Sequence, residues 1–486
     1  MDFTVLHLAA PSLVADLQPT GAQLLWIIDI YGFLLAGALV AMGVLGDRIG
    51  RRKLLLIGAA LFGLASILTA MAPTAESLIA ARALLGLAAA TLAPSTLSLI
   101  RNMFTDSKQR TVAIGIWVAS FSAGAAIGPL VGGALLVHFW WGSVFLIAVP
   151  VMMLLLVLGP WLLPEYRDPD PGRLDITSAA LSLVAILAVV YGVKQIAAGD
   201  PGIAAIVAIV GGLAVAAVFL RRQQKIENPF VDLSLFRSSA FGPMLVVYTM
   251  IFFVNFVAFL FITQYLQLVL GMSALEAGLW TLPWGGAFIV GSLVTPAIAA
   301  RTGPAVLVAG GLSLAALGFF ALTQIEMGLA IIVLGSTLFS LGLAPATALA
   351  TDLIIGTVPP SRAGTASGLS ETGAELGGAL GIALIGSAAT ALYRGTLSRD
   401  LPQGLAQHHV DAALDTLGGA LMVAEARQDS IGGRLSLSAR DAFTDSVVLG
   451  FILCGVTILA AAALTVSALR KPNRIEGTTP SEQQTA

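Results

Sequence analysis

The sequence predicts an all-α protein that crosses a lipid bilayer fourteen times. Of its 486 residues, 57% are hydrophobic and only 11% are charged, and the mean hydropathy is +0.92. Soluble domains carry about 25% charged residues. A bilayer core about 30 Å thick requires about 20 apolar residues per helix, and apolar stretches near that length fill the chain. The expected spans are 1–17, 23–46, 53–72, 77–101, 109–137, 142–163, 174–197, 201–221, 240–270, 275–300, 304–323, 328–356, 361–391 and 441–469.

The loop charges predict the orientation of these spans. Most basic residues fall in loops on one side, whereas the short loops on the other side hold only Lys194. The positive-inside rule places the basic loops in the cytoplasm. Both termini then face the cytoplasm, which requires an even number of spans and agrees with fourteen. Because the chain starts within its first apolar segment, we expect the first turns of that helix to precede Met1.

The spans divide into two groups of six around a central pair, which suggests an internal repeat.

Polar and basic residues at 222–238 alternate with apolar ones and predict a cytoplasmic linker lying on the membrane surface. The long external loop 392–440 has helical apolar spacing from His408 to Ala426, which predicts a helical hairpin. The expected regions are 1–163, an N-terminal six-helix bundle; 164–238, two additional helices and the linker; 239–469, a C-terminal six-helix bundle; and 470–486, a disordered cytoplasmic tail.

Composition and motifs exclude several classes of protein. The net charge of −2 gives no sign of a nucleic-acid partner. The single cysteine, Cys454, rules out an intrachain disulfide and argues against a zinc or iron–sulfur site. The sequence has no nucleotide-binding phosphate loop, His-Glu-x-x-His motif or nucleophile elbow. We therefore expect a protein that is not an enzyme, with no metal site and no nucleotide partner.

Carboxylates inside the predicted spans are the main functional signal. Asp2 and Asp29 fall in the first two spans, and Glu371 and Glu375 lie four residues apart in the thirteenth, on one helix face. A charge at the membrane centre costs at least about 2.5–3.5 kcal/mol on insertion scales. Two acids on one face are expected to titrate as a coupled pair and to exchange protons for a bound organic cation. The alternative is structural, either an ion pair with Arg82 or a hydrogen-bonded packing role.

Several other residues in the spans have two possible roles, one functional and one structural. Arg82 lies in the fourth span, where an arginine is costly and marks function, unless its side chain reaches the nearby external surface. Trp26 and Tyr31 flank Asp29, so they belong either to the interfacial aromatic belt or to a cation site. Trp284 is a third candidate aromatic residue for substrate, with a packing or belt role as its expected alternative. Weaker candidates, expected to be packing or belt residues, are Trp117, Trp280, Phe252, Phe253 and Phe256.

Two glycine-containing motifs stand out. In the turn after the second span, glycines permit a tight connection, and an acid stands among basic residues at a helix end. Basic residues that fix the membrane orientation of the chain would explain the positive charges of this turn. They would not explain the acid that stands among them. In the fifth span, glycines at every fourth residue predict close helix packing, and a proline permits a bend. The turn residues are Gly43, Asp47, Arg48, Gly50, Arg51 and Arg52, and the span residues are Gly124, Gly128, Pro129, Gly132 and Gly133.

These motifs resemble those of the major facilitator superfamily. The turn from Gly43 to Lys53 is similar to the signature loop of that superfamily, and the motif ending Gly132-Gly133 is similar to the antiporter motif of its drug exporters. The segment Met1–Pro11, the glutamate pair and the long loop before the last span resemble the fourteen-helix drug/proton antiporters. Within that branch, the resemblance is to exporters that confer resistance to quaternary ammonium compounds and methyl viologen. The chain departs from the branch at His7, Ser143 and Ala148, where Asn, Trp and Asn are usual.

The resemblance implies two six-helix bundles plus two central helices in a bacterial cytoplasmic (inner) membrane. It implies proton-coupling and cation-binding roles for the four acids, a proton-relay role for Arg82 and a conformational-switch role for the turn after the second span. We expect a monomeric antiporter, driven by the proton gradient without a cofactor, that exports lipophilic, mainly cationic drugs and antiseptics such as quaternary ammonium compounds, dyes and biguanides. Two alternatives stay open. One is proton-coupled transport of an endogenous metabolite or lipid, and the other is a receptor or scaffold that binds its partner through the external loop.

Overall fold

The computed structural model describes most of the chain, and the described part is helical with no strand. The first expected span lies largely outside the described residues, and so do Asp2, His7 and the C-terminal tail. The described residues are 6, 9, 12–14, 16–167, 175–197, 202–226, 229, 231, 233–237, 240–402, 405–427 and 429–469.

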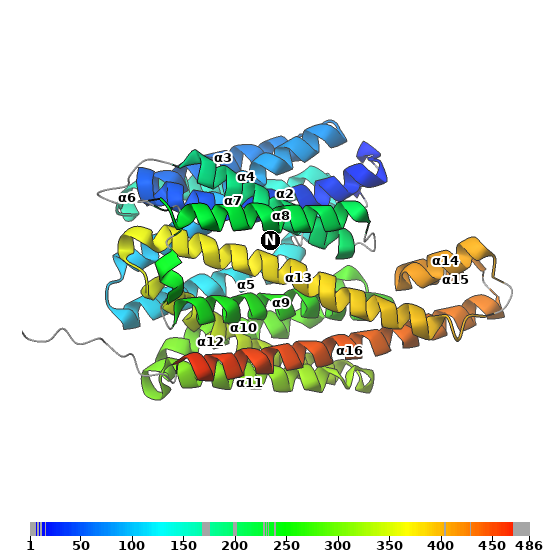
Figure 1. Cartoon of the computed structure of the whole chain (residues 1–486). Coiled ribbons are helices and arrows are strands. Elements are labelled where there is room, and N and C mark those ends of the chain that lie inside the picture. The colour runs from blue at the N-terminus through cyan, green and yellow to red at the C-terminus, as the bar shows by residue number, and fades with distance from the viewer. Residues whose placement is uncertain are drawn as a thin grey trace, which may run out of the picture.

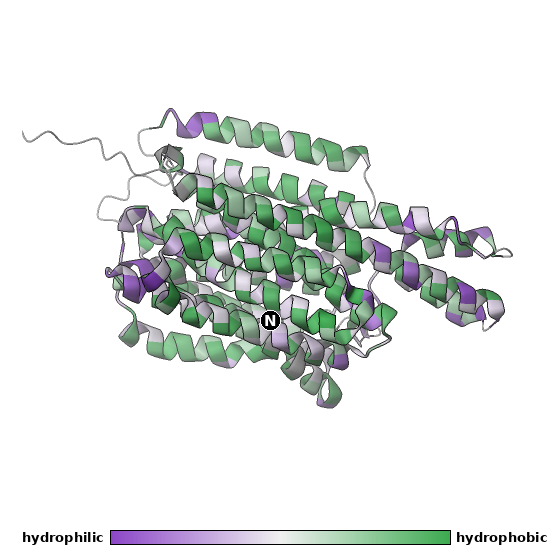
Figure 2. Ribbon diagram, turned by 90° about the horizontal axis from the view of Figure 1, so that it is seen from below, coloured by the Kyte–Doolittle hydropathy of each residue, from purple (hydrophilic) through white to green (hydrophobic). Residues whose placement is uncertain are grey.

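The expected spans from 23–46 onward coincide with described helices (Figure 1). Eleven of these helices are long and apolar enough to cross a membrane, and a shorter apolar helix runs through Thr177–Val193. Hydrophobic residues dominate the helices along their length, while polar residues gather toward the ends of the bundle and in the hairpin region (Figure 2). The first helices are α2 (Gly21–Ile49), α3 (Arg51–Ala70), α4 (Ala75–Met103), α5 (Ser107–His138), η1 (Trp141–Ile147), α6 (Ala148–Leu162), α7 (Ile176–Ala197) and α8 (Ile203–Gln223). The later ones are η2 (Leu233–Arg237), α9 (Phe241–Gln264), η3 (Tyr265–Val269), α10 (Ala274–Thr302), α11 (Pro304–Leu322), η4 (Ile325–Met327), α12 (Leu329–Gly356), η5 (Pro360–Arg362), α13 (Ala363–Leu397), α14 (Gln407–Asp415), α15 (Leu417–Arg427) and α16 (Ser430–Leu469).

Local sequence signals set several helix starts. Thr20, Thr74 and Ser273 each accept a hydrogen bond from the third residue of the following helix, whose side chain bonds back to form a capping box. Asp106 caps α5 by accepting from two backbone N–H groups. Gly50 ends α2 and begins α3 at φ 110°, a conformation that favours glycine, so the tight turn expected there is present.

The predicted helical hairpin is present as α14 and α15 (Figure 1). The flanking helices extend into the expected loop, because α13 continues to Leu397 and α16 already begins at Ser430. A separate small core explains these extensions, since Leu397 and Leu417 are buried there together with residues of α14 and α16. The Tyr393 hydroxyl donates to the Ala413 carbonyl at 2.9 Å, which ties α13 to α14.

The described part of the linker does not lie free on a membrane surface as predicted. Leu235 is buried in the core of the second bundle, and Val231 is buried against α2 and α8. The backbone N–H of Val231 donates to the side chain of Gln223 at 3.2 Å. Val231 and Leu235 therefore pack into the protein, whereas Phe236 of the same segment is 44% exposed.

A polar contact fastens the helix pair α7 and α8. Arg222 of α8 donates to both carboxylate oxygens of Asp175, at 3.2 Å each, just before α7 begins. Although partial burial raises the pKa of Asp175, hydrogen bonds from Ser178 and Arg222 outweigh it and lower that pKa to about 2. The carboxylate is therefore ionised at neutral pH.

Candidate transport site and inter-bundle latch

Helices α2 and α13 meet in an antiparallel register that fixes the depth of the acids. A Cβ atom on Gly43 would lie 2.2 Å from the Gly364 carbonyl oxygen, and one on Gly368 would lie 2.7 Å from the Leu39 carbonyl oxygen. The same register, continued along both helices, brings Glu375 of α13 level with residue 32 of α2. Because Asp29 is three residues from that point at about 1.5 Å per residue, Glu375 and Asp29 differ in depth by about 4.5 Å. Acids more than three hundred positions apart in the sequence thus share one layer of the bundle.

Glu371 and Glu375 are half-buried on α13, about 12 and 18 Å from its first residue. Their position near the centre of the membrane stays a prediction. The hydroxyl of Tyr248 on α9 donates to Glu371 Oε1 at 3.1 Å. Tyr248 is only 1% exposed, so a buried hydroxyl bonds to a half-buried carboxylate. Sequence reasoning missed Tyr248, because one tyrosine in an apolar helix has no local pattern to mark it.

Arg82 is fully buried in α4, so the alternative that it reaches an external surface is wrong. Its Nε donates to the backbone carbonyl of Ile27 on α2. Its guanidinium also lies 5.5 Å from the ring centre of Tyr31 and 5.7 Å from that of Phe145. Tyr31 is therefore a buried neighbour of Arg82 and not a residue of an interfacial belt.

The candidate aromatic residues differ in their surroundings. Trp26 is 43% exposed, and its ring centre lies 6.0 Å from that of Phe33, with half-buried Asp29 between them on α2. Phe33 in turn lies 6.4 Å from Tyr191 of α7. Trp284 is buried between Phe259 and Phe339 in the core of the second bundle. Trp26 thus lies beside an acid, and Trp284 is a packing residue.

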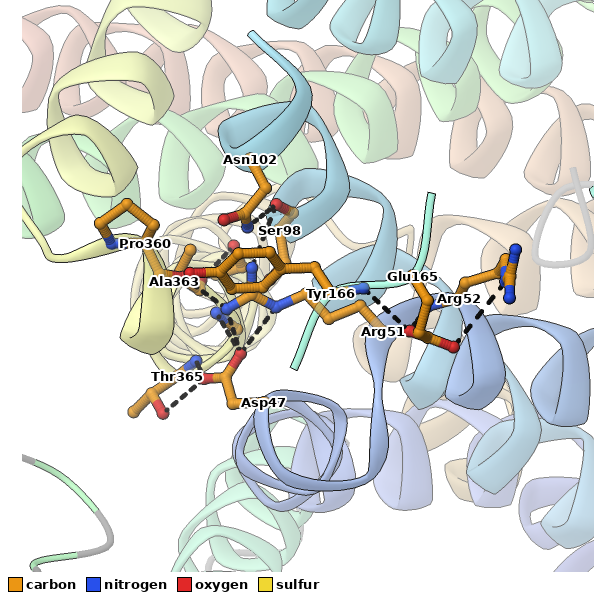
Figure 3. Close-up of polar contacts among 12 residues, drawn as sticks. Asp47, Arg51, Arg52, Ser98, Asn102, Glu165, Tyr166, Pro360, Ala363 and Thr365 are labelled. Carbon is orange, nitrogen blue, oxygen red and sulfur yellow. Dashed lines mark hydrogen bonds and ion pairs between the residues drawn. The ribbon is translucent and has the colours of Figure 1, made fainter. Parts of the chain in front are cut away.

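The turn between α2 and α3 joins the first group of helices to α13 (Figure 3). Asp47 accepts hydrogen bonds from the backbone N–H groups of Gly364 and Thr365, at 3.1 Å each, and from the Thr365 hydroxyl. Arg51 pairs with Asp47 at 2.6 Å and also donates to the Pro360 carbonyl at 2.6 Å. These N–H groups lie in the first turn of α13, where a carboxylate is favoured.

Two further arginines complete the contact between the bundles. Arg110 at the start of α5 pairs with Asp352 of α12 at 2.6 Å, and the Thr111 hydroxyl donates to the same carboxylate at 2.7 Å. Arg101 of α4 donates to the Ile355 carbonyl at 3.0 Å. We call Asp47, Arg51, Arg101, Arg110 and Asp352 the inter-bundle latch.

The remaining turn residues support the latch. Glu165, which follows α6, accepts from the backbone N–H groups of Arg52 and Lys53 at the start of α3. Arg52 donates to the carbonyls of Pro160 and Leu163, which fixes α6 against α3. Arg48 is half-buried in the last turn of α2.

The glycines of α5 do not all pack as predicted. A Cβ atom at Gly124 would meet nothing within 4 Å, so the close packing predicted for that position is wrong; one at Gly133, which lies off the four-residue spacing, would also meet nothing. Gly128 and Gly132 are buried, and the side chain of Pro129 is outside the described set. The four-residue spacing therefore does not describe one uniform packing face.

The family model described as Major Facilitator Superfamily matches residues 1–382. The chain belongs to this superfamily. It is 43% identical over 474 residues to the multidrug efflux pump LfrA of Mycolicibacterium smegmatis, covering 97% of this chain and 94% of that one. It is 35% identical over 479 residues to the methyl viologen resistance protein SmvA of Salmonella typhimurium, covering 98% and 96%. A tetracenomycin C resistance and export protein of Streptomyces glaucescens is 31% identical over 479 residues, covering 96% and 88%.

A solved structure shares the fold. The human organic anion transporter MFSD10 (TETRAN) superposes with a TM-score of 0.59 at 16% identity, covering 94% of this chain and 89% of that one. The predicted all-α fold of the Major Facilitator Superfamily is therefore confirmed. The chain is a multi-pass membrane transporter related to drug exporters and is not an enzyme.

Proposed function

We propose that this transporter is a proton-coupled antiporter that exports lipophilic, mainly cationic compounds across a bacterial inner membrane. The observation that carries the proposal is the pair of half-buried carboxylates, Glu371 and Glu375, one turn apart deep in α13. On α2, Asp29 lies at nearly the same depth as Glu375. Methyl viologen, the compound in the name of the Salmonella relative, is a dication, and two carboxylates match its charge.

The latch supplies the alternating element of the proposed cycle. The positive-inside rule supports a cytoplasmic location for the basic turn between α2 and α3, and with it for both termini. With the latch formed, the bundles are joined at the cytoplasmic end. A cation binds the deprotonated acids while the latch is open, the latch then forms, and external protons displace the cation. Each pH unit supplies about 1.4 kcal/mol, and each charge gains about 2.3 kcal/mol per 100 mV.

The proposal is tested in proteoliposomes with the variants Glu371→Gln and Glu375→Gln. We expect each variant to lower methyl viologen-driven proton release and efflux about tenfold, because an amide cannot release a proton or balance a bound cation. Proton release is followed with an internal pH dye and efflux with radiolabelled substrate. Glu425→Gln, the same change at an exposed position on α15, is the matched control and should behave as wild type.

The outcomes separate the competing functions. Unchanged proton release and efflux in both glutamate variants would refute the proposal. Proton-coupled flux that lipophilic cations neither drive nor inhibit would point instead to an endogenous metabolite or lipid as substrate. A protein that catalyses no flux but binds a partner through α14 and α15 would be a receptor.

A further inference from the structure

Helices α9 and α13 lie side by side and run in the same direction (Figure 1). An added Cβ atom at Gly377 of α13 would clash with the carbonyl oxygen of Thr249 on α9, and one at Gly381 would clash with that of Phe253. A step of four residues along α13 thus matches a step of four residues along α9. Side chains spaced by four on one helix therefore stay beside side chains spaced by four on the other.

Three aromatic residues follow this spacing along α9. The ring centres of Tyr248 and Phe252 lie 4.9 Å apart, and those of Phe252 and Phe256 lie 6.4 Å apart. Aromatic rings attract each other at such separations. We call Tyr248, Phe252 and Phe256 the aromatic ladder.

The aromatic ladder contacts α13 on both sides of the acid pair. At its first ring, the Tyr248 hydroxyl donates to Glu371 Oε1 at 3.1 Å. At its last ring, carbon atoms of Phe256 lie 2.8–3.0 Å from the position of an added Cβ atom at Gly378. The lack of a side chain at Gly378 therefore leaves room for the ring, and the ladder runs along α13 from Glu371 to Gly378.

The middle ring lies at the level of the second acid. Glu375 lies between Glu371 and Gly378 on α13, just as Phe252 lies between the two end rings on α9. The side chains of Glu375 and Phe252 are both half-buried. An aromatic ring and a carboxylate thus lie together on one side of the bundle interior, and neither is sealed in a core.

An amide beside the ladder adds a polar group. Asn255 follows Phe252 by three residues, on the same side of α9. Its Oδ1 atom is buried and accepts no hydrogen bond from the residues that the structure describes. A buried oxygen without a partner costs free energy, so a bound molecule with positive charge would be stabilised there.

We propose that the aromatic ladder is the face of the transport site that selects flat aromatic cations, and that Phe252 sets this preference. The inference rests on the proposed antiporter and names the substrate class of its acid site. The face of an aromatic ring is electronegative and attracts cations, more strongly where water is excluded. Glu371 and Glu375 balance the charge of the cation, and the rings contact its flat surface. Methyl viologen has this chemistry, because each of its two rings carries a positive charge.

The test replaces Phe252 in the full-length protein in nanodiscs and measures equilibrium binding of radiolabelled methyl viologen. Phe252→Leu keeps an apolar side chain but removes the ring, and should raise the Kd about tenfold. Phe252→Tyr keeps the ring and should stay within about threefold of wild type. Pentafluorophenylalanine at this position keeps the shape but reverses the charge of the ring face, so it should weaken binding about as much as leucine does. In proteoliposomes, Phe252→Leu should raise the KM for efflux and leave kcat nearly unchanged.

Phe253→Leu is the matched control. It removes a half-buried ring from the next position of α9, and successive residues of a helix point about 100° apart. Because Phe253 does not belong to the ladder, this variant should bind methyl viologen as wild type does.

Each result separates the aromatic face from the antiporter. If all Phe252 variants bind as wild type does while Glu371→Gln loses cation-driven proton release, the aromatic face fails and the antiporter stands. If the ring substitutions weaken binding but methyl viologen drives no proton release from wild type, the antiporter fails and the aromatic face stands. Pentafluorophenylalanine that binds as well as phenylalanine would show that the ring only fills space, which refutes the proposed selection. If Phe252→Leu does not fold, the fluorinated variant alone decides, and a wild-type protein that does not bind methyl viologen overturns both proposals.

Discussion

Replacing Asp47 by asparagine is expected to shift the transporter away from the latched state by a hundredfold or more. The Asp47 carboxylate accepts from two backbone N–H groups of α13, from Thr365 and from Arg51. Arg51 is fully buried, so the loss of its partner leaves an uncompensated buried charge. Removing one partner of a buried ion pair costs about 3–5 kcal/mol, and about 1.4 kcal/mol corresponds to a tenfold change in an equilibrium.

The effect falls on the conformational equilibrium, because three of the contacts of Asp47 cross between the bundles and exist only while the latch is formed. We expect spin labels at Ser107 and Thr357 to report a longer distance in Asp47→Asn and efflux to fall in parallel. Asp175→Asn breaks an aspartate–arginine pair inside the α7–α8 unit. It is the matched control and should cost no more than about 1 kcal/mol. An Asp47→Asn protein with the wild-type label distance would show that the carboxylate does not hold the latch.

The sequence was sufficient to predict the all-α fold and the helices from residue 23 onward. Hydropathy detects helices because lipid requires every backbone group to be satisfied within the helix. It does not detect helical turns outside the lipid, which is why the continuation of α13 to Leu397 was missed. Those turns are held by their contacts with α14, α15 and α16, and such contacts have no hydropathy signal.

The latch partners were not predictable, because they lie far apart in the chain. Arg51 and the Pro360 carbonyl are separated by 309 positions, and Arg110 and Asp352 by 242. Arg101 and Arg110 entered the sequence argument only as positive charges in a loop. Asp352 did carry a signal, because it is an acid within the expected span 328–356 and meets the criterion that selected Glu371.

The close approach of α2 and α13 identifies the second position with a large expected effect. A Cβ atom on Gly43 would lie 2.2 Å from the Gly364 carbonyl oxygen and 2.8 Å from its carbon. Backbone atoms cannot rotate away as a side chain can, so Gly43→Ala forces the helices apart. Overpacking of this kind costs typically about 1–3 kcal/mol, which corresponds to about a five- to 150-fold loss of the latched state.

The Gly43→Ala variant distinguishes the effect of close contact between α2 and α13 from the effect of the charged residues in the turn between α2 and α3. Gly43→Ala keeps the ion pair of Asp47 and Arg51, which lies within one turn. By separating the helices, it moves the N–H donors to Asp47 and the carbonyl acceptor of Arg51 out of hydrogen-bonding distance. We expect the label distance between Ser107 and Thr357 to lengthen, efflux to fall about tenfold or more, and thermal stability to change little. Gly310→Ala on α11, where an added Cβ meets nothing within 4 Å, is the matched control and should retain full efflux. If Gly43→Ala transports as well as Gly310→Ala does, then α2 and α13 do not need to meet at this point during the cycle, and the Arg110–Asp352 pair holds the latch without that contact.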